Sequence, residues 1–217
     1  MKETYFTPGT IEIKAQAMLR SLEWLKNKRP INYAPGHSAL LVLDIQSYFL
    51  SPASHAFIPS APAILVGVNA LIEAYSRRSL PIFRTRHLNT NQDAGLMATW
   101  WHDLILAGSP LSEFDASVNH SDGIEICKNR YDAFYETNLE QQLREWSISQ
   151  VVICGVMTHL CCETTARSAF MRDFEVFFTI DGTATYNEAF HRATLLNLAH
   201  GFATPVLIKD LLSRMGE

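Results

Sequence analysis

The stretch that decides the fold class is ALLVLD, residues 39–44, in which an apolar run leads directly to an aspartate. A continuous apolar run of this length is typical of a β-strand that other elements cover on both faces. Similar runs follow along the chain: LPIFRTR (80–86), GIEICK (123–128), QVVICG (150–155), EVFFTID (175–181) and TPVLIK (204–209). Together they predict a sheet of about six strands.

Stretches with helical periodicity separate these runs. They cover residues 61–79, 95–106, 138–146, 161–174 and 187–202, and another such stretch, residues 11–30, precedes the first strand. Regular alternation of strand and helix favours a doubly wound, mostly parallel sheet in three αβα layers. We therefore predict a Rossmann-like α/β fold with an extra N-terminal helix.

Composition and charge limit the class of protein. A chain of 217 residues, 47% of them hydrophobic, can bury one sizeable core. We expect a single domain over residues 1–217, with an N-terminal helical extension over residues 1–36. The net charge of −4, without a long basic run, argues against nucleic-acid and membrane partners. The N-terminus lacks the features of a secretory signal, so we expect a cytoplasmic protein.

Chemistry is expected where the strands end, because parallel strands gather their carboxyl ends at one edge, where ligands bind. Asp44 ends the first apolar run, His87 follows the second and Lys128 ends the third. Asp44 could be a turn residue or a carboxylate that moves a proton. Lys128 could be a solvated surface lysine or the partner of that carboxylate. No G-x-G-x-x-G, P-loop or G-x-S-x-G motif is present, so nucleotide binding loses its main support.

The run at 150–155 leads into GVMTHLCCETTA, residues 155–166, which contains two adjacent cysteines. Cys162 shares a helical stripe with Ala166, Ala169 and Phe170, so we expect it to face the core. Cys161 lies at the start of the predicted helix, where unpaired N–H groups and the helix dipole lower a thiol pKa. A buried thiol without a chemical role is the alternative. Of the two cysteines, Cys161 is the better candidate nucleophile.

Three motifs, in this order, resemble those of the isochorismatase-like hydrolases, a superfamily of cysteine hydrolases and their relatives. The motifs are ALLVLDIQSYF (39–49), KNRYDAF (128–134) and GVMTHLCCETTARSAFMRD (155–173). The resemblance runs from about residue 39 to the C-terminus. It implies that Asp44, Lys128 and Cys161 are catalytic, with Asp44 as the base that activates the thiol.

The resemblance also implies features of the backbone and of the assembly. It predicts a cis peptide bond between Val156 and Met157. It predicts an oxyanion hole formed by the backbone N–H groups of Met157 and Cys161. Members of the superfamily are commonly oligomers, so we expect a homo-oligomer that acts on a small-molecule substrate.

Two enzymatic branches of the superfamily compete. Amidases such as nicotinamidases carry cysteine at the Cys161 position and form an acyl-enzyme. Isochorismatases cleave a vinyl ether with the aspartate as acid and usually carry glycine at the Cys161 position. The rest of residues 158–173 nevertheless resembles the corresponding helix of isochorismatases closely. A catalytically silent binding domain is a further alternative. We favour an amidase that cleaves a small amide or a related C–N bond.

Aromatic residues near the strand ends suggest an apolar pocket for a small planar or acyl substrate. We expect Phe49, His87, Trp101 and Tyr131 in its wall.

Metal ligands are not evident in the sequence. The D-x-H pair through which nicotinamidases bind a metal is absent, and His55, His87 and His102 lack ligand spacing. No C-x2-C pair occurs among the 4 cysteines. We therefore expect neither a metal nor another cofactor.

Overall fold

The computed structural model describes residues 1–25, 32–101, 103–119 and 123–217. Its centre is a six-stranded parallel sheet with the strand order β3-β2-β1-β4-β5-β6. The topological switch point lies between β1 and β4, where the strand order changes direction. The predicted α/β fold is confirmed. The strands are β1 (Ser38–Leu43), β2 (Ile82–His87), β3 (Ile124–Lys128), β4 (Gln150–Val156), β5 (Glu175–Ala184) and β6 (Thr204–Val206).

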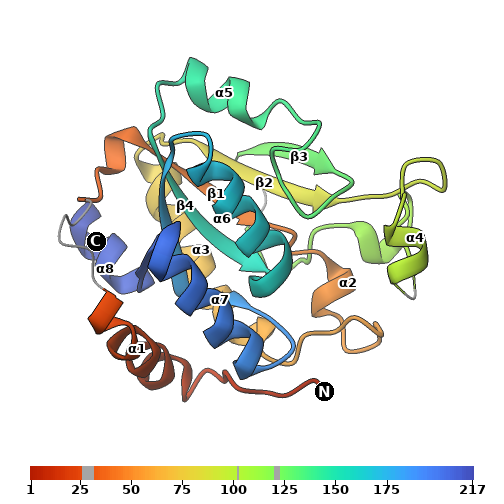
Figure 1. Ribbon diagram of the computed structural model, residues 1–217, viewed down its shortest axis with the longest axis horizontal. Coiled ribbons are helices and arrows are strands. Elements are labelled where there is room, and N and C mark those ends of the chain that lie inside the picture. Colours follow the sequence, from red (N-terminus) through yellow and green to blue (C-terminus); the bar gives the residue numbers. More distant parts are fainter. Residues whose placement is uncertain (26–31, 102, 120–122) are drawn as a thin grey trace.

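Helices cover both faces of the sheet (Figure 1). Helices α3 and α8 pack on one face and α6 and α7 on the other, while α1, the extra N-terminal helix, contacts β5. The helices are α1 (Ile11–Ser21), α2 (Ser47–Leu50), α3 (Ala61–Arg77), α4 (Met97–Trp100), α5 (Leu139–Glu145), α6 (Glu163–Phe170), α7 (Glu188–Gly201) and α8 (Ile208–Met215). Shorter turns are η1 (Glu23–Leu25), η2 (Pro35–His37), η3 (Pro110–Ser112) and the π-helical η4 (Thr158–Cys162).

The burial of each strand follows its place in the sheet. Every residue of β1 and of β4 is buried, because these central strands are covered on both faces. The edge strands β3 and β6 are only partly buried. One cluster of buried hydrophobic residues extends from Tyr5, before α1, to Met215, at the end of α8.

Gly155 allows β1 and β4 to approach each other closely at their carboxyl ends. It pairs with Leu43 and has a φ of +118°. A Cβ atom here would overlap the backbone of Leu43, and L-residues rarely adopt this conformation. Glycine thus lets the residues after the two strands, Asp44 and Met157, lie at neighbouring positions of the sheet edge.

Some elements differ in extent from those predicted, and three of them differ most. The helix expected over residues 95–106 is limited to α4, because the backbone turns to an extended conformation at Trp101. The strand expected over residues 204–209 ends at Val206, and α8 begins at Ile208, whose N–H donates to Oδ1 of Asp181 (2.9 Å). The helix expected over residues 11–30 ends at Ser21, and residues 26–30 lie outside the described residues.

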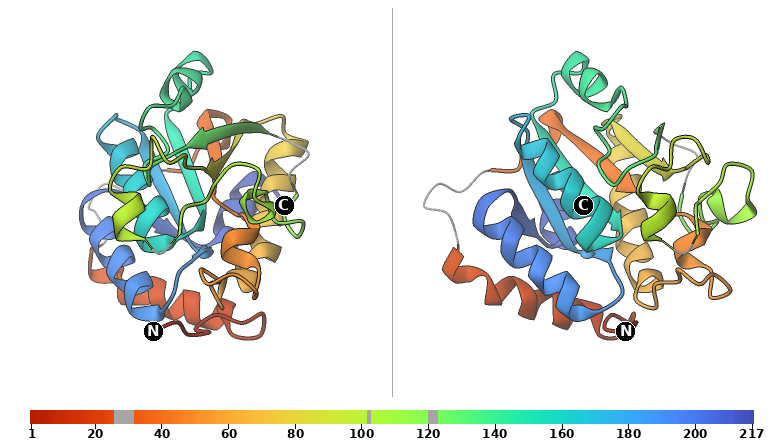
Figure 2. Two further views of the ribbon diagram at one scale, coloured as in Figure 1. Left: turned by 90° about the vertical axis from the view of Figure 1, so that its right-hand side faces the viewer. Right: turned by 45° about the vertical axis from the view of Figure 1, so that its right-hand side comes forward.

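The segment before α1 is packed into the protein. Tyr5 and Phe6 are buried, and both views of Figure 2 show this segment running beside α7. Within the described ranges, no helix has the length and apolar character needed to cross a membrane.

Candidate active site

Four strands of the sheet deliver side chains to one place at its carboxyl edge. Asp44 follows β1, His87 ends β2, Lys128 ends β3, and Cys161 follows β4 within η4. A carboxylate oxygen of Asp44, a ring nitrogen of His87 and the sulfur of Cys161 lie within 4.8 Å of one another. The strand order brings these distant parts of the sequence together around the switch point.

Asp44 is fixed by its backbone and by Thr85. Its φ is +50°, in the left-handed region that residues other than glycine rarely adopt. The hydroxyl of Thr85 donates to Oδ1 of Asp44 (2.6 Å). The other oxygen, Oδ2, is 2.7 Å from Nζ of Lys128 and accepts no other hydrogen bond from the described residues. Oδ2 is therefore the oxygen that can take up a proton.

The ammonium group of Lys128 lies at the centre of the site. Its side chain and that of Asp44 are both 0% exposed. Nζ is 3.4 Å from Sγ of Cys161 and 3.0 Å from the backbone oxygen of Arg130. The structure thus brings together the three residues predicted to be catalytic.

The turn η4 presents Cys161 and its backbone N–H group. The peptide bond between Val156 and Met157 is cis. The N–H groups of Leu160 and Cys162 both donate to the carbonyl oxygen of Met157 (3.0 and 3.2 Å), and the N–H of Cys161 between them is not a donor to that oxygen. Such π-helical turns are frequent at functional sites. The N–H groups of Met157 and Cys161 are therefore candidate donors to an oxyanion.

Burial and the ion pair together set the charges of the site. Burial raises the pKa of the Asp44 carboxyl, but the charge of Lys128 and further contacts outweigh it and hold this pKa below its ordinary value. Burial lowers the pKa of Lys128, and the charge of Asp44, with Cys161, more than reverses this effect. Burial and the charge of Asp44 raise the pKa of Cys161. The site at neutral pH therefore holds a carboxylate, an ammonium and a neutral thiol.

The sequence predicted that the helix start would lower the pKa of the Cys161 thiol, whereas in the structure this pKa is raised. The reason is that Cys161 is buried beside a carboxylate, and these two effects exceed the attraction of the Lys128 ammonium. The thiol consequently needs a base, and Asp44 lies next to it.

His87 also contacts the Lys128 ammonium. An ammonium can only donate, so Nδ1 of His87, 3.4 Å from Nζ, acts as acceptor and Nε2 carries the proton that it donates to Oδ1 of Asn89 (2.9 Å). Burial, and then the charge of Lys128, lower the pKa of His87 to about 4. His87 is therefore a neutral acceptor at physiological pH.

Three further residues, which were not predicted from the sequence, hold this arrangement: Gln46, Thr85 and Asn89. The Gln46 side chain accepts from the N–H of His87 (2.9 Å) and donates to its carbonyl oxygen (3.1 Å). Thr85 and Asn89 bind Asp44 and His87 as described above. Their signal in the sequence is weak: each is a polar residue within two positions of a predicted site residue at a strand end.

A pocket with an empty volume of ≈ 580 Å³, including its open mouth, lies over Cys161. The four residues predicted for its wall, Phe49, His87, Trp101 and Tyr131, all line it, and so do Tyr48, Asp103 and Tyr186. Nε1 of Trp101 donates to the hydroxyl of Tyr131 (2.6 Å). Among the described residues that line the pocket, none is a lysine or an arginine. The pocket therefore offers aromatic walls to a small planar group and no cationic side chain to an anionic one. His102 lies outside the described residues.

The two adjacent cysteines differ in their surroundings. Cys161 lines the pocket, whereas Cys162 is 0% exposed and belongs to the hydrophobic core with Ala166. Phe170, expected on the same buried stripe, is 46% exposed: it is the last residue of α6, and its ring contacts that of Phe202 (5.5 Å between centroids).

Comparison with known proteins gives the family. The family model described as Isochorismatase domain matches residues 38–210. The chain belongs to the isochorismatase family. Nicotinamidase 3 of Arabidopsis thaliana is 42% identical over 172 residues, which are 76% of this chain and 82% of that protein. Enterobactin synthase component B of Escherichia coli (strain K12) is 29% identical over 204 residues, 93% of this chain and 71% of that protein.

A solved member of the same fold supports the architecture. The crystal structure of a cysteine hydrolase from Pseudomonas syringae pv. phaseolicola 1448A superposes with a TM-score of 0.82. Its sequence is 22% identical, and the match covers 88% of this chain and 99% of that chain. The isochorismatase-family chain therefore shares its three-layer fold.

The donor set of this isochorismatase-family site does not fit a resident metal ion. Asp44, His87 and Cys161 form the one group of three or more possible metal ligands in the part of the chain that the structure describes. Nζ of Lys128 contacts all three of them, at 2.7 to 3.4 Å. A metal ion between these ligands would meet the like charge of the ammonium. The ammonium of Lys128 thus occupies the place between these three residues that a metal ion would need.

Proposed function

We propose that this isochorismatase-family hydrolase is a cysteine-dependent amidase that cleaves a small, uncharged, planar amide or a related C–N bond. The observation that carries the proposal is the contact of Cys161 with Lys128, itself paired with Asp44, at an aromatic pocket. The similarity to Nicotinamidase 3 of Arabidopsis thaliana supports the same class of substrate.

In the first half of the reaction, Oδ2 of Asp44 takes the thiol proton of Cys161. The sulfur then attacks the carbonyl carbon, and a C–S bond forms. The N–H groups of Met157 and Cys161 donate to the oxyanion that develops on the carbonyl oxygen. The intermediate collapses, the C–N bond breaks, and the proton held by Asp44 leaves with the amine.

In the second half, water hydrolyses the thioester. Asp44 accepts a proton from the water, and the oxygen attacks the acyl carbon in the same oxyanion hole. The C–S bond breaks, and the sulfur takes back the proton from Asp44. Lys128 keeps its proton throughout and holds the carboxylate in place, which agrees with its raised pKa.

A vinyl-ether hydrolase with Asp44 as the acid is the second candidate function. It requires a protonated carboxyl, whereas the charge of Lys128 lowers the pKa of Asp44 against the effect of burial. Isochorismate also carries carboxylates, and no cationic side chain occurs among the described residues that line the pocket. Both observations favour the amidase.

A silent binding domain is the third candidate. It would not require an aspartate–lysine pair that is completely buried beneath a thiol, since an isolated buried charge pair contributes little to stability. A thiol alkylator that failed to label Cys161 in preference to the other cysteines near neutral pH would favour this alternative.

The test is a screen of small carboxamides, carbamoyl compounds and isochorismate with the wild type, Cys161→Ala and Cys162→Ala. We expect release of ammonia or an amine by the wild type and by Cys162→Ala, and none by Cys161→Ala. Hydrolysis of isochorismate by Cys161→Ala at the wild-type rate would instead establish the vinyl-ether chemistry.

The assembly and the location of the protein remain predictions. We expect a homo-oligomer in the cytoplasm, as members of the family commonly form oligomers. Light scattering coupled to size-exclusion chromatography measures the number of subunits directly.

A further inference from the structure

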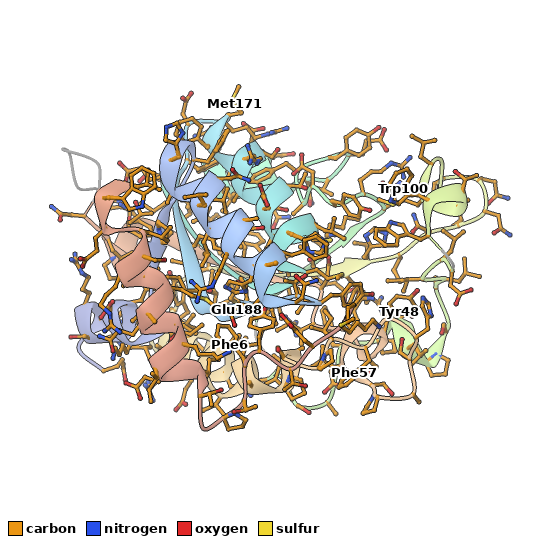
Figure 3. All side chains as sticks on the ribbon, turned by 60° about the horizontal axis from the view of Figure 1, so that its bottom comes forward. Phe6, Tyr48, Phe57, Trp100, Met171 and Glu188 are labelled. Atoms are coloured by element: carbon orange, nitrogen blue, oxygen red, sulfur yellow. The ribbon has the colours of Figure 1, made fainter. Side chains whose placement is uncertain are left out.

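The first six residues form a segment, here called the N-terminal arm, that is fixed to the protein before α1 begins. Tyr5 is 3% exposed and Phe6 is 0% exposed. The hydroxyl of Ser60, just before α3, accepts from the N–H groups of both residues (2.9 and 3.0 Å). Figure 3 shows Phe6 near the first turn of α7, where Glu188 is labelled, and the rings of Phe6 and His191 are 5.3 Å apart. The arm therefore has a defined course.

The arm binds the loop that carries Tyr186, a residue of the pocket wall. The N–H of Thr185 donates to the hydroxyl oxygen of Tyr5 (3.0 Å). The N–H of Glu3 donates to the carbonyl oxygen of Tyr186 (2.8 Å). Contacts on both sides of the Tyr186 peptide fix where its ring stands in the pocket.

The same hydroxyl of Tyr5 is connected to the turn that carries the nucleophile. It lies 2.9 Å from Nδ1 of His191, which in turn lies 3.4 Å from the hydroxyl of Thr158. His191 is fully buried and Thr158 directly follows Met157, whose N–H is a candidate oxyanion donor. One phenol group thus contacts both Thr185, the residue before Tyr186 of the pocket wall, and His191, which supports the nucleophile turn.

The arm also bridges the rim of the pocket. The ammonium of Lys2 lies 4.5 Å from the centre of the Tyr186 ring, in a cation–π contact. It donates a hydrogen bond to the carbonyl oxygen of His55. Tyr186 and His55 both line the pocket, so Lys2 joins two of its walls.

We propose that the N-terminal arm is a positioning element of the active site, in which the hydroxyl of Tyr5 contacts Thr185, next to Tyr186 in the pocket wall, and His191, which holds the nucleophile turn at Thr158. Tyr5 touches neither the substrate nor the reacting atoms and acts through these two contacts. The proposal rests on the proposed function only where kcat and KM on an amide are used as the readout. The rate at which a reagent labels Cys161 reports the placement of the thiol whether or not the protein is an amidase.

The experiment compares Tyr5→Phe with Tyr33→Phe. Tyr33 is the matched control: it is buried, and its hydroxyl is hydrogen-bonded to that of Tyr75 (2.8 Å), but it lines no part of the pocket. For both variants we measure urea unfolding, kcat and KM on an amide that the wild type hydrolyses, and the rate at which iodoacetamide labels Cys161, read by peptide mass.

We expect Tyr5→Phe to lower kcat/KM by about tenfold and to change the labelling rate of Cys161 by about threefold, because small displacements of reacting groups have large effects on rate. Tyr33→Phe should lose stability but keep both rates within about twofold of the wild type. The proposal is overturned if Tyr5→Phe matches Tyr33→Phe in both rates.

Amide hydrolysis tests the proposed function, and the labelling rate of Cys161 tests the role of the arm. If the wild type hydrolyses no amide, the proposed function fails, and the labelling rate alone decides the role of the arm. If Tyr5→Phe does not fold, Lys2→Met takes its place, since Lys2 is exposed. We then expect labelling by an N-phenyl iodoacetamide to slow by at least about twofold, and an unchanged rate would contradict the proposal.

Discussion

Nζ of Lys128 lies 2.7 Å from Oδ2 of Asp44, and both side chains are completely shielded from solvent. Neither charge has access to water, so each is stable only in the presence of the other. The pair fixes the carboxylate next to Cys161 and keeps it ionised, which makes it a base rather than an acid.

Asp44→Asn removes the base and leaves the ammonium of Lys128 buried without its counter-ion. We expect the free energy of unfolding to fall by about 3 kcal/mol or more, and turnover to fall by at least about 100-fold. Denaturant unfolding and steady-state kinetics measure the two effects.

The double variant Asp44→Asn/Lys128→Met is the control for charge burial. It removes both charges, so it should be more stable than Asp44→Asn and equally inactive. A single variant Asp44→Asn as stable as the wild type would contradict the account of the ion pair.

His87 makes the stability of the protein depend on pH. Its folded pKa is lowered to about 4, whereas an unfolded histidine titrates near 6.5. Between these values the unfolded chain binds more protons, so the free energy of unfolding falls as the pH falls from about 6.5 towards 4. His191, with its pKa lowered to about 3 by burial, acts in the same direction, and Asp181, raised to about 6 by burial, acts in the opposite one.

The variant His87→Gln isolates the contribution of His87. Between about pH 7 and about pH 4.5, its free energy of unfolding should fall by about 2 kcal/mol less than that of the wild type. Urea unfolding at the two pH values gives this difference. An equal loss in both proteins would show that His87 is not neutral in the folded state.

Trp101 and Trp100 offer a matched pair for the pocket. Trp101 lines the pocket and donates to the hydroxyl of Tyr131, whereas Trp100 is 78% exposed at the end of α4. Trp101→Phe should raise KM by about threefold to tenfold with little change in kcat, because it removes binding rather than chemistry. Trp100→Phe should leave both constants unchanged, and equal effects of the two substitutions would argue against the pocket wall.

The parts of the fold that were predictable from the sequence are those in which local pattern and tertiary burial agree. The apolar runs that became β1 and β4 are buried along their whole length, as central strands must be. Asp44, Lys128 and Cys161 could be assigned to one site because each follows a predicted strand, and the strand ends of a doubly wound sheet converge. Their roles came from the resemblance of the three motifs to those of the isochorismatase-like hydrolases.

The remaining features depend on contacts that are distant in sequence. The helix expected over residues 95–106 ends at Trp100, because Trp101 is extended and its Nε1 donates to the hydroxyl of Tyr131. The raised pKa of Cys161 could not be derived from its place at a helix start, because it follows from burial beside Asp44. The packing of Tyr5 against His191 joins residues at opposite ends of the chain and has no local signal.

The measurement that tests the central claim most directly is the mass of the enzyme during turnover. Rapid acid quenching with a slowly hydrolysed amide or an activated ester, followed by peptide mapping, locates any acyl group. We predict an adduct with the mass of the acyl moiety on Cys161, retained in Cys162→Ala and absent from Cys161→Ala. Full turnover without an adduct, or with the adduct on Cys162, would contradict covalent catalysis by Cys161.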